Sequence, residues 1–427
     1  MDILKILIHF IIFFQIIVNI NCQPYVPAGR SHHTATLIGT RIFFLGGATN
    51  IINGKFQTSN DFFYLDVSRS FNKTKDKLPF VDLSVKAKDI PPHFGAAATV
   101  FGEPKDSIFL VDGDMGKFND PYKIAFSFNS TQLEWKTITV FQGMIPTRKM
   151  IMNAVTDNNN TIYIFGGGFD GTNPAGIVEY LYSSEISTFD ATNKVWNNRN
   201  SGLIGRDGHT ATFLPDTGEI IYIGGINSGF GLSNITNLDV YNTINHTWRM
   251  QTTINPPEPR YGHTAVLTND NRIVIFGGAQ VTIEKPVKNR YVVLDTKTFE
   301  WYHGNEDPII RAPFKHHTAT LINDYMFIAF GIIDSINNQM FNNDILIYKI
   351  EDYANYSEVN NFIVENNNNA IISSTPSSDL DHNPKHSIAG AVIFGSILGI
   401  VIFGLVGFLT FRWYNKKRID MEVIPTP

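Results

Sequence analysis

The chain has 427 residues, of which 43% are hydrophobic and 17% charged. This length and composition suffice for a sizeable folded core and argue against wholesale disorder. The formal net charge of −5 argues against a nucleic-acid-binding protein, which needs a basic surface to neutralise phosphates. The single cysteine excludes any intrachain disulfide.

Residues 1–22 have the pattern of a secretory signal peptide. Lys5 supplies a positive charge, and an apolar run follows from Ile6 to Val18. This run of about 13 residues is short for a membrane span, which needs about 20. The sequence then turns polar, and we expect cleavage near Cys22, which would leave a mature chain without cysteine.

Between residues 23 and 352 one unit recurs six times, and its marker is an apolar run that ends in two glycines. The first positions of the pairs are 46, 112, 166, 224, 277 and 330, so the period is 53 to 66 residues. Asp112 and Phe330 replace the first glycine in the second and sixth copies. The marker glycines are Gly46, Gly47, Gly113, Gly166, Gly167, Gly224, Gly225, Gly277, Gly278 and Gly331.

Two further features keep the same register. A His-Thr-Ala triplet precedes four of the pairs, with its histidine at His33, His209, His263 and His317. A tryptophan follows four of them, at Trp135, Trp196, Trp248 and Trp301. Each unit holds four short runs rich in Ile, Val, Tyr and Phe, which predicts a four-stranded antiparallel sheet. Such sheets bury both faces only when they stack radially, with glycine at close approaches and tryptophan between neighbouring sheets.

These residues resemble the kelch repeat of β-propellers, which has a period close to 50 and lacks the Trp-Asp ending of WD40 units. The resemblance implies an all-β fold, a six-bladed kelch propeller over residues 23–352. The sixth unit lacks a tryptophan strand, so we expect residues 23–26 to supply its outer strand and thereby close the ring.

Three segments follow the repeats. Residues 353–386 are rich in Asn and Ser and predict a flexible stalk. Residues 387–411 predict a transmembrane helix, because they are apolar for long enough to span a bilayer. Residues 412–427 form a short basic tail, which favours a single-pass type I topology with the tail in the cytoplasm. Gly395 and Gly399 form a GxxxG motif, a weak indication of a homodimer.

Six Asn-x-Ser/Thr sequons are candidate N-glycosylation sites in a secreted chain, although chance matches are expected in so Asn-rich a sequence. Only the surface position of each asparagine can decide between these alternatives. The candidate asparagines are Asn72, Asn129, Asn159, Asn234, Asn245 and Asn355.

No catalytic motif is present, and we expect neither a metal nor another cofactor. The four repeated histidines lie on different blades and favour a structural role over a shared metal. Galactose oxidase is similar in its repeats, but its Tyr–Cys copper cofactor needs a thiol that only Cys22 offers. Sialic-acid mutarotases are also similar, and a sugar-processing pocket stays open as an alternative. Its candidate residues are Arg148, Arg206, Arg260 and Glu219.

The resemblance and the topology together predict a cell-surface module, at the plasma membrane or another secretory-pathway membrane, that binds an extracellular protein or glycan without catalysis. The longest loops after the glycine pairs are residues 48–60 and 168–182. Long loops on a rigid scaffold often carry recognition, but a neutral insertion is an equal alternative. We therefore assign no individual binding residue from the sequence.

Overall fold

A computed structural model describes residues 25–116, 123–138, 142–143, 145–172, 176–227, 231–281, 285–305, 312–334 and 340–364. The predicted signal peptide, the transmembrane helix with its GxxxG motif, the tail and most of the stalk lie outside these ranges. Within the described ranges, no helix is long and apolar enough to cross a membrane.

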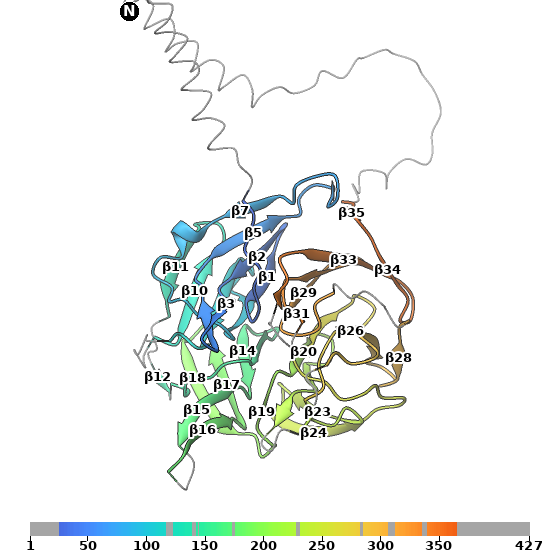
Figure 1. Cartoon of the computed structure of the whole chain (residues 1–427). Helices are drawn as coiled ribbons and strands as arrows, with labels where there is room; N and C mark the ends of the chain where they lie inside the picture. The colour runs from blue at the N-terminus through green and yellow to red at the C-terminus, as the bar shows by residue number, and fades with distance from the viewer. Residues whose placement is uncertain are drawn as a thin grey trace, which may run out of the picture. The chain divides into compact units, whose positions relative to one another are not determined.

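Six antiparallel sheets stand around a common axis as the blades of a propeller, which confirms the predicted all-β, six-bladed fold (Figure 1). The inner strands, from blade 1 to blade 6, are β1 (Thr34–Ile38), β8 (Ala97–Phe101), β13 (Asn153–Thr156), β20 (Thr210–Leu214), β25 (Thr264–Leu267) and β29 (Thr318–Ile322). The second strands are β2 (Arg41–Leu45), β9 (Ser107–Val111), β14 (Thr161–Phe165), β21 (Glu219–Ile223), β26 (Arg272–Phe276) and β30 (Tyr325–Ala329).

The outer half of each blade contains two more strands. The third strands are β5 (Phe62–Asp66), β10 (Ala125–Asn129), β17 (Glu185–Asp190), β23 (Asn237–Asn242), β27 (Tyr291–Asp295) and β33 (Ile345–Ile350). The outermost are β7 (Phe80–Asp82), β11 (Glu134–Thr137), β18 (Val195–Asn200), β24 (Thr247–Thr252), β28 (Trp301–His303) and β34 (Tyr356–Glu358). A short strand, β12 (Gln142–Gly143), adds to blade 3 in parallel with β18, and one 3₁₀ turn spans Ser84–Lys86.

The core lies between the blades. The second strands are buried along almost their whole length, which explains why they are continuous apolar runs in the sequence. Three of the repeat tryptophans contact aromatic rings of the preceding blade: Trp135 lies against Phe62, Trp196 against Phe109 and Trp248 against Phe165. Trp301 is buried among the side chains of blades 4 and 5. Each tryptophan therefore joins its blade to the one before it.

The ring closes in a different way from the one the sequence suggested. Strand β34 pairs with β33 and is the fourth strand of blade 6, so the prediction that residues 23–26 supply it is wrong. Residues 25 and 26 form no strand, and Tyr25 instead packs against Phe63 at a ring-centroid distance of 5.4 Å. The fold therefore continues beyond residue 352, the boundary that the sequence suggested.

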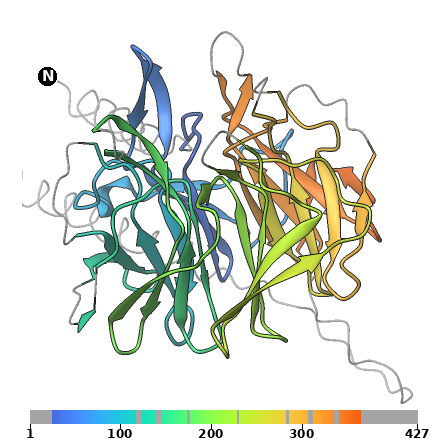
Figure 2. The same cartoon turned by 90° about the horizontal axis from the view of Figure 1, so that it is seen from below.

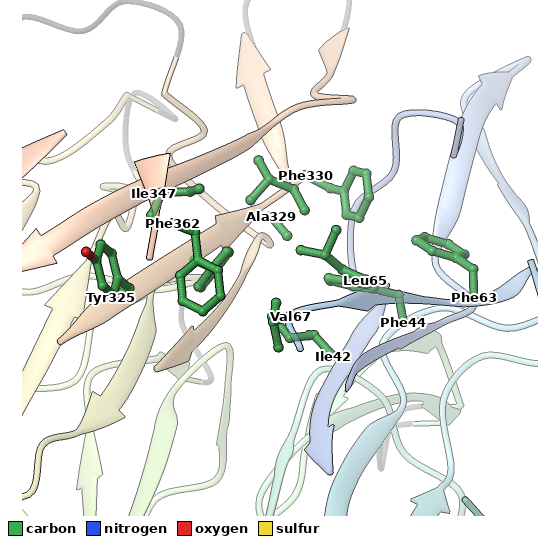
Figure 3. Packing of buried hydrophobic residues seen from close by; sticks show 12 residues of the cluster. Ile42, Phe44, Phe63, Leu65, Val67, Tyr325, Ala329, Phe330, Ile347 and Phe362 are labelled. Atoms are coloured by element: carbon green, nitrogen blue, oxygen red, sulfur yellow. The ribbon is translucent and has the colours of Figure 1, made fainter. Parts of the chain in front are cut away.

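After β34 the chain crosses from blade 6 to blade 1. Strand β35 (Asn361–Phe362) pairs with β6 (Phe71–Asn72), which belongs to the loop between β5 and β7. The backbone N–H of Val364 donates to Ser70 Oγ at 2.8 Å. Figure 3 shows Phe362 between Tyr325 of blade 6 and the side chains Ile42 and Val67 of blade 1. We call residues 356–364 the clasp, because they hold the two ends of the ring together.

Hairpins extend from the ends of the second strands in three blades. They are β3 (Ala48–Ile52) with β4 (Lys55–Thr58), β15 (Gly168–Thr172) with β16 (Val178–Tyr182), and β31 (Ile332–Asp334) with β32 (Met340–Phe341). In blade 4 the short strands β19 (Arg206–Asp207) and β22 (Ile226–Asn227) pair instead. Figure 2 shows the blue β3–β4 hairpin and the orange β31–β32 strands on the same side of the propeller. We call this end the hairpin face and the opposite end the far face.

Candidate functional site

A closed ring of six backbone hydrogen bonds surrounds the axis at the hairpin face. One residue of each blade takes part, and its N–H donates to the carbonyl of the corresponding residue in the preceding blade at 2.7 to 3.0 Å. All six have positive φ, between 55° and 69°. Because each of the six N–H groups donates within the ring, the ring offers a ligand no free backbone donor. The six residues are His32, Gly95, Ile151, Gly208, Gly262 and His316.

Three of the four repeated histidines join neighbouring blades just below this ring. His263 Nε2 lies 3.1 Å from Thr210 Oγ1 of the preceding blade, and His317 Nε2 lies 3.0 Å from Thr264 Oγ1. His33 Nε2 makes the same contact with Thr318 Oγ1 at 2.9 Å and so links blade 1 to blade 6. The histidine of one triplet therefore contacts the preceding blade, and its threonine contacts the following blade. The linear sequence does not show this contact between units.

The same histidines explain the first glycine of three pairs, and His93 takes this place opposite Gly46. A Cβ on Gly224 would lie 2.8 Å from His263 Cε1 and 2.4 Å from the carbonyl oxygen of Arg260. Gly166 and Gly277 face His209 and His317 in the same manner. The glycines therefore leave the space into which the next blade places its imidazole.

We expect Gly224→Ala to destabilise the propeller by at least about 2 kcal/mol, because it combines this clash with a strained backbone. Gly39→Ala is the matched control, because Gly39 has a similar positive φ of 57° but no heavy atom near its added Cβ. Thermal unfolding of the two variants should separate the clash from the backbone cost. Equal melting temperatures would contradict this account of the glycine pair.

The central channel is small and uncharged. Four consecutive residues from each of the six blades enclose a cavity of about 200 Å³. This is less than the roughly 300–1,000 Å³ of ordinary ligand pockets. Its histidines are neutral, because burial lowers the pKa of His33, His209 and His263 well below 6.5 and that of His317 to about 3. Among the described residues, no group of three or more His, Cys, Asp or Glu side chains is placed to hold a metal ion.

The candidate acid/base residues of the sugar-processing alternative do not meet in this channel. Arg206 is buried against Asp239 at 2.9 Å, and Arg260 donates to the carbonyls of Gly277 and Asn289. Glu219 forms a two-pronged ion pair with Arg249 at 2.8 and 2.9 Å, at the start of β21.

Arg148 does not share the position of the other two arginines. It is Lys149 that stands two residues before the ring in blade 3, paired with Glu185 at 3.3 Å, as Arg30 pairs with Asp61 in blade 1. Each of these buried cations pairs with a carboxylate at the hairpin-face end of its blade.

An aromatic cluster lies at the centre of the hairpin face. His32 and His316 stack with their ring centroids 3.7 Å apart. The rings of Phe94 and Phe56 contact that of His32 and each other. The ring of Tyr261 contacts that of His316. The cluster thus joins blades 1, 2, 5 and 6 and connects the ring to the β3–β4 hairpin. The repeat pattern did not predict this cluster, although the aromatic residues immediately before the inner strands were a signal.

Apolar side chains are exposed on all three hairpins. Ile52 is 51% exposed, Val178 is 73% exposed and Met340 is 59% exposed. Single exposed apolar residues are ordinary, but three on the hairpins of one face that also carries an aromatic cluster are typical of an interaction surface. The loops 48–60 and 168–182 singled out in the sequence contain two of these hairpins. The third hairpin, β31–β32, follows the degenerate glycine pair at Phe330 and was not among the predicted loops.

The β15–β16 hairpin is anchored to the next blade. Tyr180 Oη donates a hydrogen bond to Asp207 Oδ2 at 2.5 Å. A Cβ at Gly168 would meet the Tyr180 hydroxyl, so glycine is required beneath this tyrosine. Burial raises the pKa of Asp207 to about 7. The hairpin is therefore positioned by a buried polar contact and does not depend only on its own strand pairing.

The six blades, the glycine pairs and the interblade tryptophans define a kelch-type β-propeller. A kelch-repeats domain model, described as KLHDC2/KLHL20/DRC7, matches residues 95–331, more than half of the chain. The chain belongs to this kelch-repeat family.

Two curated relatives illustrate the similarity. Kelch domain-containing protein 3 of Rattus norvegicus is 26% identical over 283 residues, which cover 64% of this chain and 67% of that protein. The Rab9 effector protein with kelch motifs of Homo sapiens is 30% identical over 153 residues, 35% of this chain and 40% of that protein. The solved structure of YjhT aligns with a TM-score of 0.57 over 78% of this chain and 99% of that one. Its 12% identity shows a common fold only.

Proposed function

We propose that this protein is a non-catalytic binding module that holds a protein partner on its hairpin face. The observation that carries the proposal is the set of three hairpins with exposed apolar side chains that extend from the same face of the propeller as the aromatic cluster. Interfaces commonly combine such an aromatic and apolar centre with a polar rim. The name of the Rab9 effector with kelch motifs indicates that one kelch relative acts through a protein partner.

A protein partner fits this chain better than a sugar substrate does. The channel is smaller than an ordinary ligand pocket and lacks charged side chains in its wall. The described candidates for acid/base chemistry are engaged in ion pairs or carbonyl contacts elsewhere in the blades. The hairpins, in contrast, offer exposed apolar surface, and a bound protein would remove this surface from water.

The proposal places the propeller outside the cell or in the lumen of the secretory pathway. Its support is the apolar N-terminal stretch and the apolar segment followed by basic residues near the C-terminus. Labelling of intact cells with a membrane-impermeant amine reagent tests this placement, because the described blades carry exposed lysines such as Lys55. Labelling only after permeabilisation would overturn the extracellular placement.

The binding test uses single substitutions on the hairpins. A partner is first captured from cells by crosslinking to the immobilised protein, and its affinity is then measured with purified partner. We expect Ile52→Asp, Val178→Asp or Met340→Asp to weaken binding about 10-fold or more, because each removes roughly 1.5–3 kcal/mol of apolar burial.

Ile244→Asp is the matched control. Ile244 is 76% exposed, but it lies in the β23–β24 turn at the far face. Its affinity should equal that of the unchanged protein. Equal losses in all four variants, or none in the hairpin variants, would place the binding surface elsewhere.

A further inference from the structure

The candidate glycosylation sequons are distributed unevenly over the two faces of the propeller. Asn159 lies in the turn between β13 and β14, Asn245 in the turn between β23 and β24, and Asn355 between β33 and β34. Strand register places all three turns at the end opposite the glycine pairs: Thr156 faces Ile162, for example, whereas Asn153 faces Phe165, next to Gly166. These three asparagines are therefore on the far face.

Their side chains are also available for modification. All three are exposed, and none of their side-chain amide nitrogens donates a hydrogen bond to a described residue. In Asn245 only the amide oxygen is engaged, by the backbone N–H and the hydroxyl of Thr247. A sugar on Nδ2 would thus project into solvent without breaking a contact.

Two other sequons differ. Asn72 belongs to β6, and its Nδ2 donates to Asn361 Oδ1 of the clasp at 2.5 Å. Asn129 is half-buried at the end of β10, and its Nδ2 donates to Asp106 Oδ2 at 3.2 Å. A glycan on either nitrogen would compete with a contact that holds the fold. Asn234 is exposed too, but it precedes β23 at the glycine-pair end of blade 4, where the N–H of Ser233 donates to the carbonyl of Gly225, and blade 4 carries none of the three hairpins.

We infer that N-glycans occupy Asn159, Asn245 and Asn355, so that they cover the far face in blades 3, 4 and 6 and leave the three hairpins accessible. This inference rests on the proposed extracellular or lumenal placement of the propeller. It assigns glycosylation to the far face and partner binding to the hairpin face.

Site occupancy tests the assignment in the full chain expressed in eukaryotic cells. Enzymatic release of N-glycans in heavy-oxygen water converts each occupied asparagine into a labelled aspartate, which peptide mass spectrometry locates. We expect labelling of Asn159, Asn245 and Asn355 well above that of Asn72 and Asn129. Equal labelling of all five would overturn the structural selection.

The outcome separates this inference from the proposed function. Vacant far-face sites in a chain that is labelled on intact cells would overturn the glycan assignment alone. Vacant sites in a chain that is labelled once the plasma membrane alone is permeabilised would overturn the extracellular or lumenal placement on which it rests.

A designed glycan tests the division between the faces. Lys55→Thr creates a sequon at Asn53, in the turn between β3 and β4, without altering the far face. We expect the added glycan to reduce partner capture at least 10-fold, whereas Asn159→Gln, Asn245→Gln and Asn355→Gln leave capture unchanged. Lys55→Ala controls for loss of the lysine. Full capture by the glycosylated Lys55→Thr variant would overturn the claim that the hairpin face must stay bare.

Discussion

Acidification from about pH 7.5 to about pH 5 is expected to unfold the propeller, and the buried histidines are the reason. His33, His93, His209, His263 and His317 are all buried. Burial lowers the pKa of each below 6.5. The unfolded chain therefore binds protons below about pH 6.5 that the folded chain does not bind. Their stabilising contribution is complete above that pH and is lost as the pH falls.

Two buried carboxyl groups act in the opposite direction. Burial raises the pKa of Asp112 and of Asp207 to about 7. Because the folded pKa exceeds the unfolded one, their contribution is largest at low pH and declines as the pH rises from about 4 to about 7. Each titrating group changes the free energy of unfolding by at most about 1.4 kcal/mol per pH unit. Burial lowers the pKa of His32 and His316 as well, so seven imidazoles against two carboxyls leave a net loss of up to about 7 kcal/mol per pH unit on acidification.

Thermal unfolding measured at several pH values checks this prediction. Since a domain has only about 5–15 kcal/mol of stability, even half of the expected slope should lower the melting temperature by roughly 10 °C between pH 7 and pH 5. His263→Gln should flatten the slope, whatever its effect at neutral pH. A melting temperature independent of pH in this range would refute the role of the histidines.

The repeat register carried most of the information about the fold. Residue types recurring every 53 to 66 residues predicted six sheets. The degenerate copies at Asp112 and Phe330 were included because each follows an apolar run, which the structure shows as a buried second strand. The same register could not show that His263 contacts Thr210 of another blade, since pairing between units depends on how the units stack. Similarly, the ring of backbone hydrogen bonds was hidden, because His32, Ile151 and His316 occupy positions where glycine would have indicated positive φ.

The site was less predictable than the fold. Two of the three hairpins were visible as long loops, yet their exposed apolar residues had no repeat partner that could mark them as functional. Ring closure was mispredicted because β34 and β35 are only three and two residues long and lie in a polar, Asn-rich stretch. Strands this short show no hydrophobic periodicity in the sequence. Their positions depend on tertiary pairing, of β34 with β33 in blade 6 and of β35 with β6 in blade 1.

Removal of the clasp is expected to have the second large effect. A chain that ends at residue 352 lacks β34 and β35 and exposes the edge of β33, whereas a chain that ends at residue 364 retains both strands. We expect the shorter chain to lose cooperative unfolding or to aggregate, because an unpaired edge and an open interface remain. Equal melting curves for the two chains would show that the clasp adds nothing.

Within the clasp, the effect should concentrate in one side chain. Phe362 is 1% exposed, and its ring lies 5.3 Å from those of Tyr325 and Phe327 and 5.5 Å from that of Phe71. Phe362→Ala should therefore cost about 3–5 kcal/mol and lower the melting temperature by roughly 5–10 °C. Its neighbour Ile363 is 52% exposed, and Ile363→Ala should cost less than about 1 kcal/mol. If the two variants melted together, the ring would be closed by the backbone pairing of β35 with β6, with no need for the buried aromatic ring.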